Sequence, residues 1–194
     1  IEEMHSFEQG GTLAVFLACH ALARGYLVKI YSYNLEVIDP TWYALPAKEM
    51  EDRLGLQAQL KRGKKLQAAT REYLKFLRLG GKLMFEELSA SLIRRYLNRG
   101  IPILTGLSAT HLYRCARENS GTDQYDDIAG TPAGHFVVLG GYDKSYRTVS
   151  IVDPLESNPI ADTQIYHVKI QRVINAILLG IVTHDANLLI IEPG

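Results

Sequence analysis

The chain has 194 residues, of which 47% are hydrophobic and 22% charged, and its 21 basic and 21 acidic side chains give a formal net charge of +0. This length suffices for one domain, or two small ones, to bury a core without metal or disulfide cross-links. Balanced charge gives no overall attraction to nucleic acid or acidic membranes, and no apolar run reaches transmembrane length.

The two cysteines, Cys19 and Cys115, are too few for a disulfide framework and favour a reducing compartment. We therefore expect a cytoplasmic protein that does not bind membranes. The chain begins with Ile1 rather than Met, which leaves a removed N-terminal signal or segment as an open alternative.

Helical patterns dominate the first half of the chain. Apolar residues cover the first predicted helix nearly all round, whereas the later ones carry apolar stripes at helical spacing. A double glycine, Gly80-Gly81, ends the longest pattern as a cap rather than as a processing site. In chain order we predict a helix at 12–23 behind a Gly10-Gly11-Thr12 entry, a strand at 26–31, a helical segment at 47–79 and a helix at 85–98.

The second half carries the stronger β signal. Two runs rich in β-branched residues, 135–139 and 148–152, flank a polar turn at 143–147 and predict an antiparallel hairpin. The polar stretch before them, 120–133, is predicted to be a surface loop. Further strands are expected at 101–104, 165–170 and 188–191, with a helix at 173–179. No linker divides the chain, so we expect one α+β domain over residues 1–194.

The hairpin brings one histidine close to one aspartate. If the turn is centred near residues 144 and 145, facing residues have index sums of about 288 to 290. An even sum puts His135 either opposite Asp153 or one diagonal away, with roughly 7 Å between Cβ atoms. A sum of 289 sends the two side chains to opposite faces of the sheet. The sequence therefore permits a His–Asp pair without requiring it.

Such a pair has a recognised chemical use. The carboxylate fixes the tautomer of the imidazole, which then acts as general base for a nucleophile. Gly134 and Pro154 place His135 and Asp153 at strand ends, where side chains can face a cleft. The alternative is structural: a partly buried histidine bonded to a nearby acid, and an Asp-Pro turn that ends a strand.

The chain offers no convincing nucleophile for this base. Cys19 lies about two turns into an apolar helix, where a structural role is expected. Cys115 stands between Arg114 and Arg117, whose charges favour a thiolate, and is the better of two poor candidates. Ser108 and Thr110 follow a strand, but no G-x-S-x-G or S-x-x-K motif surrounds them.

Metal and cofactor sites are not expected. The remaining histidines have no metal-ligand spacing with one another or with cysteine, and structural roles are expected for all of them. No glycine-rich nucleotide motif occurs either. These histidines are His5, His20, His111, His167 and His184.

A basic face on the long helical segment is the remaining candidate interaction surface. It begins at Lys61-Arg62-Gly63-Lys64-Lys65 and continues through Arg71, Lys75 and Arg78. Basic helical faces bind phosphate backbones, but more often they are solvated. With zero net charge, nucleic-acid binding is not favoured.

The residues around His135 resemble a known family. Residues 134–143, followed by 149–154, look like the His and Asp signature of the bacteriocin-processing peptidase-like family, a branch of the papain-like cysteine peptidases. Residues 100–104 resemble the strand before that hairpin, and the match is looser over 1–35. The resemblance implies a papain-like α+β fold, with helices packed on an antiparallel sheet. The helical segment at about 45–80 has no counterpart in the resemblance, and we expect it to be an insert.

The resemblance also implies roles for His135 and Asp153, and it implies that the segment with the catalytic cysteine is missing. His135 would be the general base and Asp153 its orienter. Family members carry a Gln and then a Cys-Gly at the start of a helix, whereas after Gln9 this chain reads Leu-Ala-Val-Phe at 13–16. The cysteine-bearing N-terminal segment is therefore expected to be absent from this chain, or the protein is a pseudoenzyme.

Three functional hypotheses follow. The first is a papain-fold thiol hydrolase or acyltransferase acting on a peptide or amide, inactive as this chain because its nucleophile is missing. The second is a non-catalytic module that binds a peptide or protein on the same fold. The third is a binder of nucleic acid or an acidic partner through the basic face.

Overall fold

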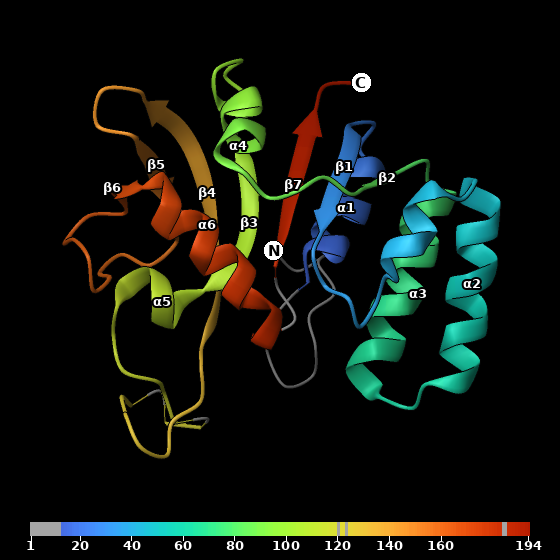
Figure 1. The fold of residues 1–194 in the computed structure, drawn as a ribbon, viewed down its shortest axis with the longest axis horizontal. Helices are drawn as coiled ribbons and strands as arrows, with labels where there is room; N and C mark the ends of the chain where they lie inside the picture. Colours follow the sequence, from blue (N-terminus) through green and yellow to red (C-terminus); the bar gives the residue numbers. More distant parts are fainter. Residues whose placement is uncertain (1–12, 120, 123, 184–185) are drawn as a thin grey trace. The chain divides into compact units, whose positions relative to one another are not determined.

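The computed structural model describes residues 13–119, 121–122, 124–183 and 186–194, and it combines helices with a seven-stranded mixed sheet (Figure 1). The expected α+β class is therefore confirmed. The described residues form two compact units. Unit 1 is the part up to Glu86 together with Leu189–Gly194, and unit 2 is Glu87–Leu188. A single domain with a helical insert stays a prediction, and the predictions for His5, Gln9, Gly10-Gly11-Thr12 and His184 lie outside the described residues.

Unit 1 is mostly helical, as its sequence predicts. Its first helix begins after Leu13, whose side chain makes no capping hydrogen bond, and its strands β1 and β2 pair in parallel. The sheet is mixed rather than antiparallel because of this pair. In chain order the elements are α1 (Ala14–Leu22), β1 (Leu27–Ser32), η1 (Pro40–Ala44), α2 (Ala47–Leu60), α3 (Lys64–Arg78) and β2 (Lys82–Met84).

The segment predicted as one helical pattern at 47–79 forms two helices. Lys61 and Gly63 both adopt extended backbone angles, which interrupts the helix, and α2 then packs on α3. Gly80 ends α3 with a φ of 88°, a left-handed conformation that glycine adopts without steric cost. The next amide, that of Gly81, donates to the Phe76 carbonyl at 2.9 Å. The double glycine is thus a helix cap, as predicted.

Unit 2 holds the predicted hairpin inside a longer antiparallel meander. Strands β3, β4, β5 and β6 are neighbours in sequence order, and every pair is antiparallel. The last strand, β7, begins in unit 2 and ends in unit 1. The elements are α4 (Ala90–Leu97), β3 (Ile103–Ser108), α5 (Ala109–Tyr113), β4 (Gly134–Asp143), β5 (Thr148–Val152), β6 (Ile165–Lys169), α6 (Ile170–Leu179), η2 (Gly180–Thr183) and β7 (Asn187–Glu192).

Two helices of unit 2 differ from the prediction. Helix α4 begins at Ala90 rather than Phe85, because Ser89 caps it by accepting a hydrogen bond from the Leu92 amide at 3.2 Å. The short helix α5 was not predicted. Ser108 caps it in the same way through the His111 amide, at 3.3 Å.

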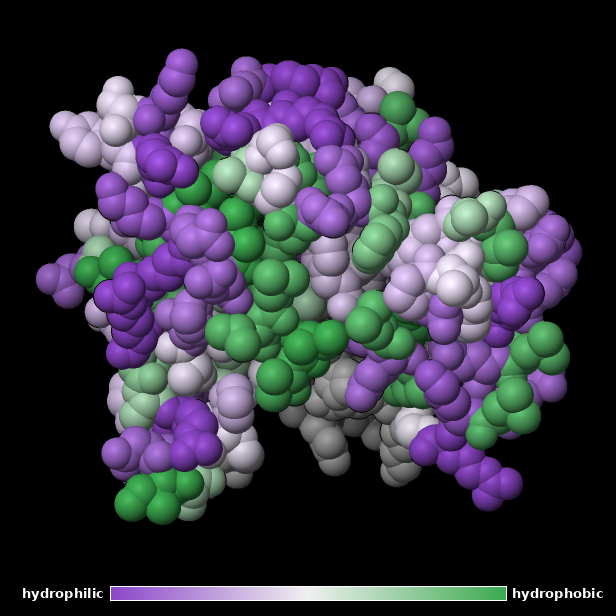
Figure 2. Space-filling model, viewed as in Figure 1, coloured by the Kyte–Doolittle hydropathy of each residue, from purple (hydrophilic) through white to green (hydrophobic). Residues whose placement is uncertain are grey.

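Helix α6 packs on the meander and on α5 (Figure 1). Val173 and Ile177 on its inner side are fully buried. Leu178, Leu179 and Val182, at its end and in η2, are 45%, 45% and 60% exposed, and Figure 2 shows apolar atoms at the surface there. None of the helices in the described ranges is long and apolar enough to cross a membrane.

Candidate active site

A β-bulge sets the register of the hairpin that carries His135. Next to the turn, Tyr142 pairs with Val149, an index sum of 291, whereas beyond Gly140 the pair Leu139–Ile151 has a sum of 290. The ladder shifts by one residue between Leu139 and Gly141. Because side chains alternate along a strand, this extra residue places His135 and Asp153 on the same face, one diagonal apart.

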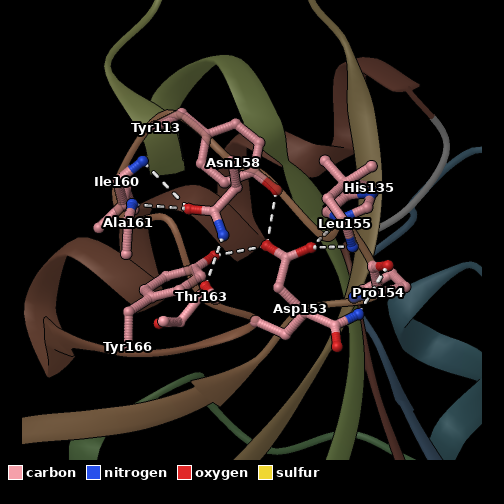
Figure 3. A network of polar contacts seen from close by, with 11 residues as sticks. Tyr113, His135, Asp153, Pro154, Leu155, Asn158, Ile160, Ala161, Thr163 and Tyr166 are labelled. Atoms are coloured by element: carbon pink, nitrogen blue, oxygen red, sulfur yellow. Dashed lines mark hydrogen bonds and ion pairs between the residues drawn. The ribbon is translucent and has the colours of Figure 1, made fainter.

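His135 and Asp153 are joined by a hydrogen bond (Figure 3). The imidazole Nε2 lies 2.8 Å from the carboxylate Oδ1. The His135 side chain is 17% exposed and that of Asp153 is fully buried. Of the two arrangements that the sequence leaves open, the structure therefore has the one in which the pair forms.

The buried carboxylate accepts three further hydrogen bonds. The backbone amide of Leu155 donates to Oδ1 at 3.0 Å. The hydroxyls of Tyr113 and Tyr166 donate to Oδ2 at 2.7 and 2.6 Å. Neither tyrosine was predicted to belong to the site, because Tyr113 lies 40 residues before Asp153 on the unpredicted helix α5. Only the alternation of buried and exposed positions along 165–169 could have pointed to Tyr166.

These donors determine the charge of Asp153. Burial by itself raises the pKa of a carboxyl group, because it disfavours the charged form. The hydrogen bonds from Tyr166, His135, Tyr113 and the Leu155 amide act in the opposite direction, and the pKa of Asp153 is lowered below its usual value. The group is thus a carboxylate at neutral pH in spite of its burial.

The loop after Asp153 is folded by an asparagine. Asn158 is buried, and its Oδ1 accepts hydrogen bonds from the amides of Ile160 and Ala161 at 3.1 and 3.0 Å (Figure 3). Its Nδ2 donates to the Thr163 carbonyl at 3.0 Å. This closed loop connects Asp153 to β6 and so brings Tyr166 back to the carboxylate.

The contact with Asp153 assigns the two nitrogens of the ring. A carboxylate only accepts, so Nε2 carries a proton, and a neutral ring then has its lone pair on Nδ1. Nδ1 forms no hydrogen bond with any residue that the structure describes. The Tyr113 ring packs beside the imidazole, with centroids 6.0 Å apart and planes at 49°. Nδ1 is therefore the basic nitrogen of the His135 ring, and the hydrogen bond from Nε2 to Asp153 fixes the orientation of that ring.

A comparison with protein families gives a match over the region that contains the hairpin. Residues 60–174 match the Peptidase_C39 like family, and the matched segment contains both His135 and Asp153. The chain belongs to this family. It is therefore a peptidase-like protein with a papain-like fold. Comparisons with curated proteins and with solved structures find no match.

The two cysteines of this family member differ in surroundings. Cys19 is 4% exposed and its thiol donates to the Glu72 carbonyl at 3.6 Å. Burial, together with the charge of Glu72, raises the pKa of the Cys19 thiol to about 11. Cys115 is partly exposed and not in a disulfide. Cys19 is thus a poor nucleophile at neutral pH, as its place in an apolar helix predicts.

The Ser108 and Thr110 hydroxyls accept hydrogen bonds from backbone amides, and structural roles for the other histidines stay a prediction. Ser108 caps α5, and Thr110 accepts a hydrogen bond from the Ala133 amide at 3.0 Å. His20 contacts Arg24 at 2.9 Å, and His167 is exposed on β6. Within the described ranges, no three His, Cys, Asp or Glu side chains are placed to hold a metal ion.

Part of the predicted basic face is paired with acids. Lys75 lies 3.6 Å from Glu72, and Arg78 lies 3.5 Å from Glu51. Lys61 donates to a backbone carbonyl, that of Glu36, at 3.1 Å. Pairing reduces the positive potential that these side chains present, and nucleic-acid binding stays an untested prediction.

Proposed function

We propose that the protein performs thiol-dependent acyl transfer on a peptide or amide, with His135 as general base and Asp153 as the residue that orients it. The observation that carries the proposal is the 2.8 Å contact between Nε2 and Oδ1. It leaves Nδ1 as the nitrogen that takes a proton. Membership of the Peptidase_C39 like family supports the class of reaction.

The chemistry follows from the two states of the imidazole. Nδ1 accepts the proton of a thiol, and the resulting thiolate attacks the substrate carbonyl carbon. The imidazolium then gives that proton to the departing amine as the C–N bond breaks, which leaves a thioester. Water regenerates the thiol in a hydrolase, and an amine does so in an acyltransferase. Asp153 stabilises the imidazolium without taking its proton.

The nucleophile in this proposal is neither Cys19 nor Cys115. Cys19 is buried and its pKa is raised to about 11, so little of it is thiolate at neutral pH. No hydrogen bond joins Cys115 to His135 within the described residues. We therefore expect residues 1–194 by themselves to have no turnover.

The test is covalent labelling of the protein as its gene encodes it. A peptide with an electrophilic ketone is incubated with the protein, and the modified residue is identified by mass spectrometry. We expect labelling of a cysteine other than Cys19 or Cys115. His135→Ala is expected to slow it by about 100-fold or more, the usual contribution of a general base.

His167→Ala is the matched control, because His167 is exposed on β6, away from the Asp153 carboxylate contacts. Equal labelling rates in the wild type and in His135→Ala would overturn the assignment of the base. If the peptide binds saturably but no cysteine is labelled, the protein is a peptide-binding module on the same fold.

A further inference from the structure

The two oxygens of Asp153 have separate partners. Oδ1 accepts from His135 and from the Leu155 amide, whereas Oδ2, among the residues that the structure describes, accepts from the Tyr113 and Tyr166 hydroxyls (Figure 3). The tyrosines come from different elements, Tyr113 from α5 and Tyr166 from β6. Both are buried, at 8% and 5% exposure, so water does not readily replace them.

The donors matter because a buried carboxyl group tends to take a proton. A protonated Asp153 could donate to Nε2, which would move the ring proton to Nδ1 and remove the lone pair that acts as the base. Short hydroxyl bonds to the charged form oppose this protonation. Burial, with the bond to Asp153, raises the pKa of both tyrosines, so that they stay protonated donors throughout the neutral range.

We propose that Tyr113 and Tyr166 form a hydroxyl clamp that keeps Asp153 ionised and thereby holds His135 in the tautomer with its proton on Nε2. The clamp rests on the proposed role of His135 as general base. Its members are positioning residues, since their contacts are to Asp153 and not to a reacting atom.

Three other charged or titratable side chains of the described part of the chain interact with the clamp or with each other beside it. His135 from β4 is the titratable group bonded to Asp153 itself. Behind Tyr166, Arg172 of α6 contributes positive charge to the tyrosine, and Arg114 lies close enough to interact with Arg172. Neither arginine is bonded to the carboxylate, so the two hydroxyls are the side chains that stabilise the charge on Oδ2.

Replacement by phenylalanine isolates the hydroxyl. Tyr113→Phe keeps the ring that packs against His135, at 6.0 Å between centroids, and removes only the bond to Oδ2. Tyr166→Phe, on β6, likewise keeps the ring and removes only the hydrogen bond from the Tyr166 hydroxyl to Oδ2. Tyr146→Phe is the control, because Tyr146 is 69% exposed in the β4–β5 turn.

The first measurement is the titration of the Asp153 carboxyl carbon and of the His135 ring nitrogens by NMR. We expect each clamp variant to raise the pKa of Asp153, the double variant to raise it more, and the control to leave it unchanged. An Asp153 signal that titrates at the same pH in the wild type and in the double variant overturns the clamp. This readout does not depend on any enzymatic activity.

The second measurement is the pH profile of the labelling rate described above. Each hydroxyl removed is expected to shift the part of the profile that reports the ionisation of Asp153 upward by about one pH unit, because a bond to a charged group contributes about 1.5 kcal/mol or more. A uniform loss at every pH indicates a merely structural role and rejects the proposal.

The two proposals fail in different ways. A wild type without thiol labelling, but with the expected NMR shifts, contradicts the proposed function and leaves the clamp's control of Asp153 standing. Labelling that depends on His135 but not on the tyrosines contradicts the clamp alone. In an Asp153→Asn background, Tyr166→Phe is expected to leave the pH profile unchanged, since the charge that it stabilises is absent.

Discussion

At the scale of single residues, Asp153 links the site to the stability of the protein. Its folded-state pKa is lowered, so its ionisation stabilises the fold above the unfolded-state pKa of about 3.9. That contribution is lost as the pH falls through the lower, folded-state value. The group therefore makes the protein sensitive to acid in the range just below pH 4.

Asp153→Asn removes this contribution. At pH 7 we expect the free energy of unfolding to fall by about 3 kcal/mol, because an amide cannot accept all four hydrogen bonds that the carboxylate receives. Urea unfolding from pH 3 to 7 measures this loss in the free energy of unfolding. The difference in that free energy between the variant and the wild type should shrink below pH 4. A difference that is constant with pH would show that the charge is not the stabilising feature.

The same scale shows what the sequence could and could not predict about the site. His135 and Asp153 were found because they stand at two ends of one local hairpin, where index sums limit their separation. Tyr113 was not found, because the sequence around it predicts neither α5 nor the direction of the Tyr113 side chain. Its contact with Asp153 depends on packing between elements 40 residues apart.

At the scale of elements, the bulge at Gly140 decides whether the site exists. The turn fixes an index sum of 291, and an odd sum continued along the strands would separate His135 from Asp153. The sequence predicted the hairpin but left three registers open, because a bulge has no strong sequence signal. Gly140 of β4 has no partner in β5, and this extra residue sets the register in which His135 and Asp153 share a face.

Deleting Gly140 should leave the pair intact. The deletion removes the unpaired residue, so Gly141 still faces Ser150 and Leu139 still faces Ile151 in a regular ladder, and we expect the Nε2–H resonance of the pair to remain in the NMR spectrum. Gly140→Ala is the matched control. An added Cβ meets Val152 only at 3.6 Å, an ordinary contact, so the pair should persist. Loss of the pair after the deletion would contradict this register, because it would mean that the two strands slide past one another when the bulge is removed.

At the scale of the whole molecule, the chain returns to unit 1 at its end. The strand predicted at 188–191 is present as β7, but its neighbours could not be predicted, since β1 lies about 160 positions earlier in the sequence. Leu189 and Ile190 are almost completely buried. Lys29 of β1 also donates to Glu192 at 2.7 Å. Unit 1 thus depends on residues that are far from the rest of it in the sequence.

Removal of residues 189–194 should destabilise unit 1. The two buried side chains contribute about 5 kcal/mol together, whereas the partly exposed pair of Lys29 and Glu192 adds about 1 kcal/mol at most. We expect the amides of β1 to exchange with deuterium far faster in the truncated protein. Removal of Pro193 and Gly194 alone, both exposed, is the control and should have little effect. Unchanged protection of β1 after the longer truncation would show that unit 1 holds this strand without β7, and that burial of Leu189 and Ile190 is not what stabilises it.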